Sequence, residues 1–150
     1  MVVRLLDHQD IRGYLNPAQL GQVDPIELLS LDGSRLVLEM IQIKWIYFVR
    51  EFVENFEPER KAFLSRPKLD GLWVRLRFRD DDTIEGIVPN NLLELLDRGV
   101  QITPPDLHGQ SLRMFIPRTA LLEMTALGVV GVARRKPVGV EVAQPRLFNE

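Results

Sequence analysis

The chain of 150 residues contains no cysteine, and its apolar runs are all short. The absence of cysteine excludes disulfides, thiolate metal sites and cysteine nucleophiles, and it is typical of proteins from a reducing compartment. The longest apolar run, residues 126–133, is far shorter than the roughly 18 residues of a membrane-spanning helix. Charges at Arg4 and Asp7 interrupt the apolar stretch that a secretory signal needs. We therefore expect a cytoplasmic protein with no membrane partner.

Features that carry chemistry are also scarce. The sequence has no nucleophile elbow, phosphate-binding glycine loop or dinucleotide fingerprint. Its only two histidines, His8 and His108, fall in predicted turns of different parts of the chain, which is a poor basis for a metal site. The run Asp80–Asp82 lacks the alternating ligands of a calcium loop, and we interpret it as the solvated tip of a hairpin. We expect a non-enzymatic protein with no catalytic residues, metal, cofactor or small-molecule substrate.

An internal similarity is the most informative feature that is present. Residues 3–16 recur as residues 76–89, with Gly13 matched by Gly86 at a constant offset of 73 residues. In each copy an alternation of apolar and polar residues enters an acidic turn and returns through Ile-x-Gly. This pattern has the period of two that is typical of strands, and it predicts a β-hairpin in each copy.

A short helical turn and further strands follow each hairpin. Asn16 precedes the first helical turn as its N-cap, and Asn90 or Asn91 caps the second. The apolar segments that come next predict strands at residues 26–31, 36–38 and 41–47 in the first copy and at 100–103, 112–116 and 120–127 in the second. The chain is therefore predicted to be mainly β, with five short strands in each of two units.

Five short strands with a glycine in the second one resemble the Sm-like (LSm) barrel. The resemblance implies two tandem Sm-like five-stranded small barrels, unit 1 over residues 1–48 and unit 2 over residues 73–130. It also assigns Gly13 and Gly86 as structural glycines, at positions where the second strand bends. The whole chain resembles a bacterial family of small proteins with this tandem arrangement, which implies no activity. Neither copy contains the loop motif by which Sm proteins hold RNA.

Two segments lie outside the predicted units. The connector, residues 49–72, is predicted to be helical because apolar residues recur at helical spacing over residues 48–56. The alternative extends the preceding strand through Val49. Six aromatic residues between Trp45 and Phe63 are predicted to pack the two units together. Residues 131–150 form a C-terminal extension of different composition.

A basic strand face is the candidate contact for an anion or a nucleic acid. It comprises six residues: Arg4, Arg12, Trp73, Arg75, Arg77 and Arg79. The predicted hairpin register places Arg77 opposite Glu85 and Arg4 opposite Arg12. With a net charge of −2 and a pI near 5.8, the alternative is a solvated face whose charges are balanced by neighbouring acids.

The C-terminal extension contains a second candidate contact. Gln144, Leu147 and Phe148 resemble the short peptides by which bacterial proteins dock on the sliding clamp of DNA polymerase. The alternative is that Leu147 and Phe148 pack on the protein's own surface.

We favour a non-enzymatic interaction or scaffolding module that binds a protein partner or itself as a homo-oligomer. Open strand edges in such small units tend to pair with other chains. The alternative hypothesis is a protein that binds single-stranded RNA or DNA through the basic face.

Overall fold

The computed structural model describes residues 1–49, 61–105 and 111–131. These residues are mainly β and contain no α-helix. The strands are β1 Val2–Leu5, β2 Asp10–Tyr14, β3 Ile26–Ser30, β4 Arg35–Leu38, β5 Ile43–Val49, β6 Gly71–Phe78, β7 Thr83–Val88, β8 Gly99–Ile102, β9 Ser111–Pro117 and β10 Leu121–Val130. Short 3₁₀ turns lie at Pro17–Gln19, Met40–Gln42, Glu94–Leu96 and Arg118–Ala120. In the described part of the chain, no helix is long and apolar enough to cross a membrane.

The hairpins β1–β2 and β6–β7 have the same turn geometry. Each turn has three residues and ends in a residue with a positive φ, 73° at His8 and 67° at Asp81. The backbone hydrogen bonds that close the turns match at an offset of 73 residues: Leu5 N donates to Gln9 O, and Phe78 N donates to Asp82 O. A three-residue turn that ends in the left-handed conformation matches the twist of the flanking strands. The sequence similarity therefore corresponds to equivalent local structure.

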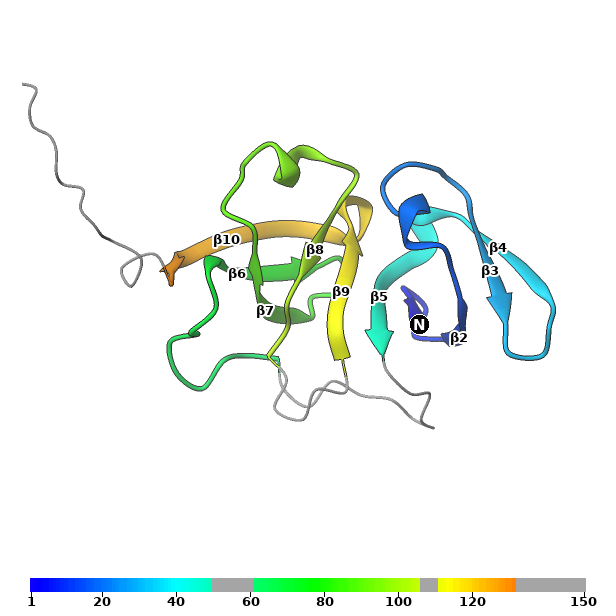
Figure 1. The fold of residues 1–150 in the computed structure, drawn as a ribbon, viewed down its shortest axis with the longest axis horizontal. Helices are drawn as coiled ribbons and strands as arrows, with labels where there is room; N and C mark the ends of the chain where they lie inside the picture. The colour runs from blue at the N-terminus through cyan, green and yellow to red at the C-terminus, as the bar shows by residue number, and fades with distance from the viewer. Residues whose placement is uncertain (50–60, 106–110, 132–150) are drawn as a thin grey trace, which may run out of the picture.

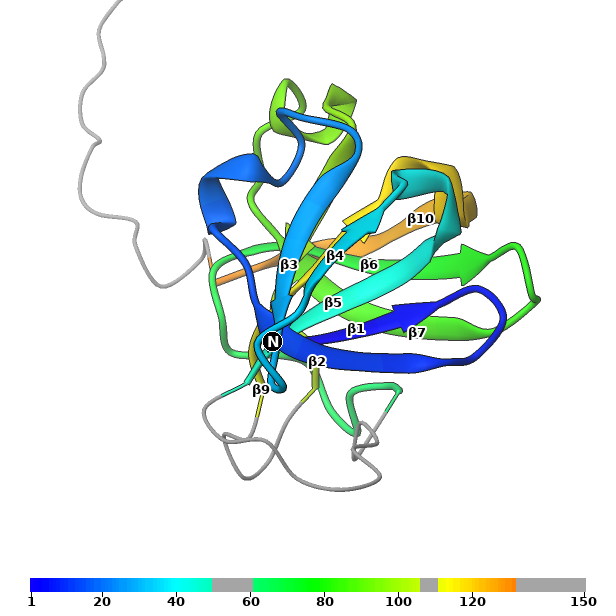
Figure 2. The same ribbon diagram turned by 90° about the vertical axis from the view of Figure 1, so that its right-hand side faces the viewer.

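The strands form two antiparallel sheets (Figures 1 and 2). The larger sheet has the order β4-β3-β2-β1-β5-β9-β8 and the smaller one β10-β6-β7. An isolated bridge between Ile87 and Thr103 connects the smaller sheet to the segment that follows β8. We call residues 1–49 the N-terminal half and the remaining described residues the C-terminal half. If the strands of each half are numbered in chain order, their order in space is fourth, third, second, first, fifth in both halves. In the C-terminal half, the contact between the second and third strands is the bridge between Ile87 and Thr103.

The sheets are not closed into barrels, in contrast to the predicted architecture. Among the described residues, β4 and β8 end the larger sheet, and β10 and β7 end the smaller one. The ends at β7 and β8 face each other at the isolated bridge between Ile87 and Thr103, whereas β4 and β10 have a neighbour on one side only. The N-terminal half does not close on itself, because β5 pairs with β1 on one side and with β9 of the other half on the second side. The mainly β prediction is correct, whereas two separately closed barrels are not seen.

Each half has a hydrophobic core that also receives side chains from the other half. The N-terminal core contains Val3, Ile26, Leu28, Ile43 and Ile46 together with Phe115 from β9. The C-terminal core contains Val74, Leu76, Phe78, Ile102 and Ile116 together with Val2, Trp45 and Tyr47 from the N-terminal half. This exchange couples the folding of the two halves because neither core is complete without the other.

Gly13 and Gly86 lie at matching positions in the second strands, and each is closely approached by the third. A Cβ atom at Gly13 would collide with the backbone carbonyl oxygen of Leu29. A Cβ atom at Gly86 would lie 2.6 Å from the Cδ1 atom of Ile102. Only glycine leaves enough space for this approach, which places the third strand over the core.

The connector differs from the prediction where the structure describes it. Val49 is the last residue of β5, so the alternative of an extended strand is correct there. Residues 61–70 contain bends and no helix. The remaining connector residues, 50–60, lie outside the described part of the chain, as does the helical pattern over most of 48–56.

Candidate interaction site

The joint between the halves is formed by β5 and β9, which lie side by side in the middle of the molecule (Figure 1). Their antiparallel register pairs Ile46 with Phe115 and Tyr47 with Met114. Residues 43–48 are all buried, although their side chains are divided between the two faces of the strand. Both faces are buried because one points to the N-terminal core and the other to the C-terminal core.

Aromatic side chains contribute much of the joint. The Trp45 ring is in edge-on contact with the rings of Tyr47 and Phe78, at centroid distances of 5.6 Å and 5.2 Å. Arg113 of β9 lies over the Phe48 ring at 5.2 Å. Edge-on aromatic pairs and cation–π contacts add to the free energy gained from area burial. Phe63 does not join this group and instead packs on Trp73.

A buried lysine connects the halves electrostatically. Lys44 of β5 is 2 % exposed, and its Nζ atom donates hydrogen bonds to Asp80 Oδ2 at 2.7 Å and to Asp82 Oδ2 at 2.9 Å. The same ammonium lies 4.4 Å from the centroid of the Trp45 ring. Lys61 Nζ donates to the other oxygen of Asp82 at 2.7 Å. The acidic turn of the second hairpin is thus largely a binding site for Lys44, and the prediction of a merely solvated tip is wrong for Asp80 and Asp82.

These contacts lower the pKa of both carboxyl groups. Burial acts to raise the pKa of Asp80, but hydrogen bonds from Lys44 Nζ and from the backbone N–H of Asp82 outweigh it and lower the pKa below the ordinary 3.8. Burial likewise opposes the lowering at Asp82, where hydrogen bonds from Lys61 and Lys44 dominate. Both carboxyl groups therefore stay ionised, and the ion pairs persist, down to mildly acidic pH.

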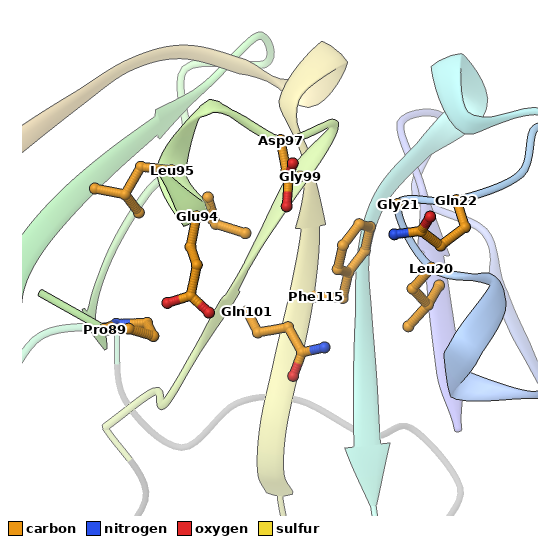
Figure 3. A pocket seen from close by; sticks show the side chains of 11 residues that line it. Leu20, Gly21, Gln22, Pro89, Glu94, Leu95, Asp97, Gly99, Gln101 and Phe115 are labelled. Atoms are coloured by element: carbon orange, nitrogen blue, oxygen red, sulfur yellow. The ribbon is translucent and has the colours of Figure 1, made fainter. Parts of the chain in front are cut away.

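A pocket of about 350 Å³ opens beside the joint (Figure 3). Figure 3 shows the Phe115 ring between β9 and β5, facing the segment that follows the first 3₁₀ turn. Leu20, Gly21 and Gln22 come from that segment, and Pro89, Glu94, Leu95, Asp97, Gly99, Val100 and Gln101 come from the C-terminal half. The pocket is a consequence of the way in which the halves meet at Phe115.

A second pocket, of about 220 Å³, lies beside the open edge at β10. Its lining comprises Leu95, Asp97, Val100, Arg118, Leu121, Leu122, Glu123 and Met124. Three of the apolar side chains, Leu95, Leu121 and Met124, are partly buried against the C-terminal core. An apolar hollow next to an unpaired strand edge is suited to a side chain of an added strand.

The basic face is largely occupied by contacts within the protein. Arg77 contacts Asp81 at 3.1 Å and Glu123 at 3.4 Å, and Arg79 Nε donates to Thr119 O. The Trp73 indole N–H donates to Glu85 at 3.0 Å. Arg77, Arg79 and Trp73 therefore make polar contacts with other residues of this chain.

The hairpin register also differs from the prediction. The strands pair Arg4 with Asp10 and Arg75 with Glu85, whereas Arg12 is paired with Val2 and Arg77 with Thr83. The prediction centred each turn one residue too late. The two guanidinium–carboxylate hydrogen bonds between Arg4 and Asp10, at 2.8 and 2.9 Å, replace the predicted repulsion.

Other predicted site residues give less information. His8 is exposed, with Nε2 at 4.0 Å from Asp80 Oδ2. No group of three potential ligands placed to hold a metal ion occurs within residues 1–49, 61–105 and 111–131. His108 and the docking candidates Gln144, Leu147 and Phe148 lie outside the described residues. Sequence reasoning did not identify Lys44 or Phe115, because one resembles any strand lysine and the other any core phenylalanine.

The comparisons with known proteins place the chain in a family without assigning an activity. Residues 1–128 match the model of a family of unknown function, DUF6982, and the chain therefore belongs to this family. No curated protein and no solved structure matches the chain.

Proposed function

We propose that this protein is a non-enzymatic interaction module, built from two Sm-like units, that binds other chains by adding a strand to its open edges. The matching strand order of the two halves and their equivalent first hairpins support the two-unit interpretation. Strand addition uses backbone hydrogen bonds for affinity and side-chain pockets for specificity.

The observation that carries this proposal is the joint between β5 and β9. It pairs the fifth strand of the N-terminal half with the fourth strand of the C-terminal half. The sheet ends at β7 and β8 face each other at the bridge between Ile87 and Thr103. Among the described residues, the other two sheet ends are the remaining fourth strand, β4, and the remaining fifth strand, β10. The free strand β4 corresponds to β9 at the joint, and the free strand β10 corresponds to β5. Two copies of the chain meet head to tail if β4 of one pairs with β10 of the next.

The side chains at the open edges predict a weaker contact than the internal joint. The 3₁₀ turn before each fifth strand aligns Met40–Gln42 with Arg118–Ala120. On this alignment Leu122 and Glu123 take the places of Lys44 and Trp45, and Val37 takes the place of Phe115. A pairing between copies would lack the buried lysine and the aromatic contacts. We therefore propose reversible association, in contrast to the permanent joint within the chain.

Sedimentation equilibrium tests the proposal. We expect the apparent mass to rise between micromolar and millimolar concentrations, and we expect Val37→Lys to abolish the rise, because a lysine on an edge strand disfavours pairing. Val37 is 60 % exposed, so the substitution costs little stability. Val23→Lys is the matched control, because Val23 is also exposed but lies outside the edge strands. A mass that is constant over the whole range, together with no binding of any added strand, would contradict the proposal.

Single-stranded nucleic acid is the less favoured alternative. The contacts of Arg4, Arg77 and Arg79 with acidic groups and carbonyl oxygens already use much of their hydrogen-bonding capacity. Phosphate binding would have to compete with these contacts.

A further inference from the structure

We infer that the pocket beside β10 receives an aromatic side chain from an extended segment of a partner protein, which pairs with β10 as an added antiparallel strand. This inference rests on the proposed function and specifies what the added strand presents. It follows from a comparison of the β10 edge with the equivalent edge of the N-terminal half, where an added strand is already in place.

In the N-terminal half, the equivalent site is filled by Phe115. This residue comes from β9, lies opposite Ile46 in the strand register and is only 3 % exposed. It belongs to the same core cluster as five residues of the N-terminal half: Leu20, Ile26, Met40, Ile43 and Ile46. The chain therefore contains one example of strand addition to a fifth strand, with an aromatic ring as the anchor.

The pocket at β10 is lined by the counterparts of those five residues. Both helical turns follow an asparagine whose side chain accepts a backbone N–H two residues on, Asn16 in one half and Asn91 in the other. The asparagines align Leu20 with Leu95, and the 3₁₀ turns before the fifth strands align the last three residues with Arg118, Leu121 and Met124. Ile26 corresponds to Val100, because Ile26 pairs with Leu38 and Val100 pairs with Ile116, the counterpart of Leu38. All five line the pocket of about 220 Å³. The pocket is thus the site of Phe115 without its ring.

The chemistry of the pocket favours an aromatic residue flanked by polar ones. Its apolar base consists of Leu95, Leu121 and Met124, whereas Asp97, Arg118 and Glu123 supply charges at the lining. Arg118 donates hydrogen bonds to the carbonyl oxygens of Leu95 and Leu96, which hold this part of the lining in place. A preformed apolar hollow with fixed polar groups is typical of a pocket for one anchoring side chain.

A second copy of the chain is a poorer occupant than a partner protein. In the register of the internal joint, β4 of another copy would place Val37 opposite Met124. Valine is much smaller than phenylalanine and would leave part of the pocket unfilled, so it loses the contacts that make an anchor effective. The pocket therefore selects a strand with an aromatic residue at this position.

The chain's own β9 sequence is a suitable probe, because it fits the equivalent edge. We propose to titrate the full chain, labelled with ¹⁵N, with a synthetic peptide of residues 111–118 (Ser-Leu-Arg-Met-Phe-Ile-Pro-Arg) and to follow amide shifts. We expect shifts along β10 and around Leu95, and binding at least about tenfold weaker for the peptide with Phe115→Ala. Met124→Asp in the full chain should weaken binding of the parent peptide by a similar factor. Val129→Asp, at an exposed position farther along β10, is the matched control and should bind as the parent does.

The outcomes separate this inference from the proposed function. Equal binding of the phenylalanine and alanine peptides along β10 would overturn the aromatic pocket and leave strand addition intact. Shifts confined to β5 would also overturn it, because the peptide would then be replacing β9. If no peptide binds and the chain does not self-associate, both proposals fail. Thermal melting of Met124→Asp must match that of Val129→Asp, and if it does not, Leu95→Asp replaces it as the pocket variant.

Discussion

The strands β5 and β10 occupy the same place in their halves but have different surroundings. Both are fifth strands, and both pair with the first strand of their half, β1 or β6. The first six residues of β5 are buried, whereas all residues of β10 before Val130 are exposed or only partly buried. The difference arises because β5 has a second neighbour in β9 and, among the described residues, β10 has none. The residues of a fifth strand are therefore buried or exposed according to whether a strand lies on its second side, and not according to its place in the strand order.

The comparison is sharpest at Trp45 and its counterpart Glu123. Trp45→Ala should lower the free energy of unfolding by about 3–5 kcal/mol, because it removes a large side chain that is 1 % exposed in the C-terminal core. Glu123→Ala should change it by no more than about 0.5 kcal/mol, because the contact between Glu123 and Arg77 is at the surface. Urea unfolding followed by far-UV circular dichroism measures both. Equal losses in the two variants would show that the joint is not the more stable environment.

A second prediction concerns the charge at the joint. Lys44→Met keeps most of the side-chain volume but leaves Asp80 and Asp82 without their buried cation. We expect the free energy of unfolding to fall by about 2–4 kcal/mol at pH 7. This is somewhat less than the effect of breaking a fully buried ion pair, because both carboxylates are partly exposed. Leu122→Met, the counterpart substitution at the open edge, should have little effect.

The loss caused by Lys44→Met should depend on pH. The pKa values of Asp80 and Asp82 are below 3.8 in the folded parent, so the ion pairs contribute their full stability above about pH 4. This contribution decreases as the pH falls through the folded-state pKa values, because the unfolded chain binds protons first. The difference in the free energy of unfolding between the parent and Lys44→Met should therefore become smaller below pH 3.8. A difference that is unchanged at acidic pH would mean that packing, rather than charge, causes the loss.

The smallest expected difference is between the two structural glycines. Gly13→Ala should destabilise the protein by about 2–3 kcal/mol, because the new methyl group meets the carbonyl oxygen of Leu29, which belongs to a paired strand. A Cβ atom at Gly86 instead meets the Cδ1 atom at the end of the Ile102 side chain, which shifts more easily than a backbone carbonyl, so Gly86→Ala should cost about 1 kcal/mol. Differential scanning calorimetry should give the lower melting temperature for Gly13→Ala. The reverse order would indicate that the third strand is held more rigidly over Gly86.

Local features of the fold were predictable from the sequence, because they depend on neighbouring residues. The alternation of apolar residues predicted strands that the structure has within a few residues of the expected bounds, and Asn16 caps a 3₁₀ turn as predicted. The predicted hairpin register was wrong, although the predicted strands were right. Moving the centre of the turn by one residue leaves every apolar side chain on the same face, so the alternation of apolar residues fits both registers. The left-handed residue at His8 or Asp81 decides between them. Histidine and aspartate are both enriched in this conformation, but Asp82 suits it as well as Asp81 does.

The candidate site was less predictable, because its residues come together from distant parts of the chain. Asp80 and Asp82 resembled a solvated tip, and the partner that makes them part of the joint lies 36 and 38 residues earlier. Phe115 resembled a core residue of its own half, but it completes the other one. The contribution of these residues depends on which strand lies beside which, and their own sequence environment does not encode it.

The class of the fold and its local units follow from the amino-acid pattern alone: a mainly β chain with two equivalent hairpins, each with a glycine at the crowded position of its second strand. These features follow from the period of two and from the steric needs of single residues. Three features could be known only once the chain was folded: β5 pairs with β9, each half completes the core of the other, and β4 and β10 remain with a neighbour on one side only. Backbone hydrogen bonds between strands are alike for nearly all residues, so the choice of neighbour depends on the summed packing and charge of side chains such as Trp45, Phe115 and Lys44.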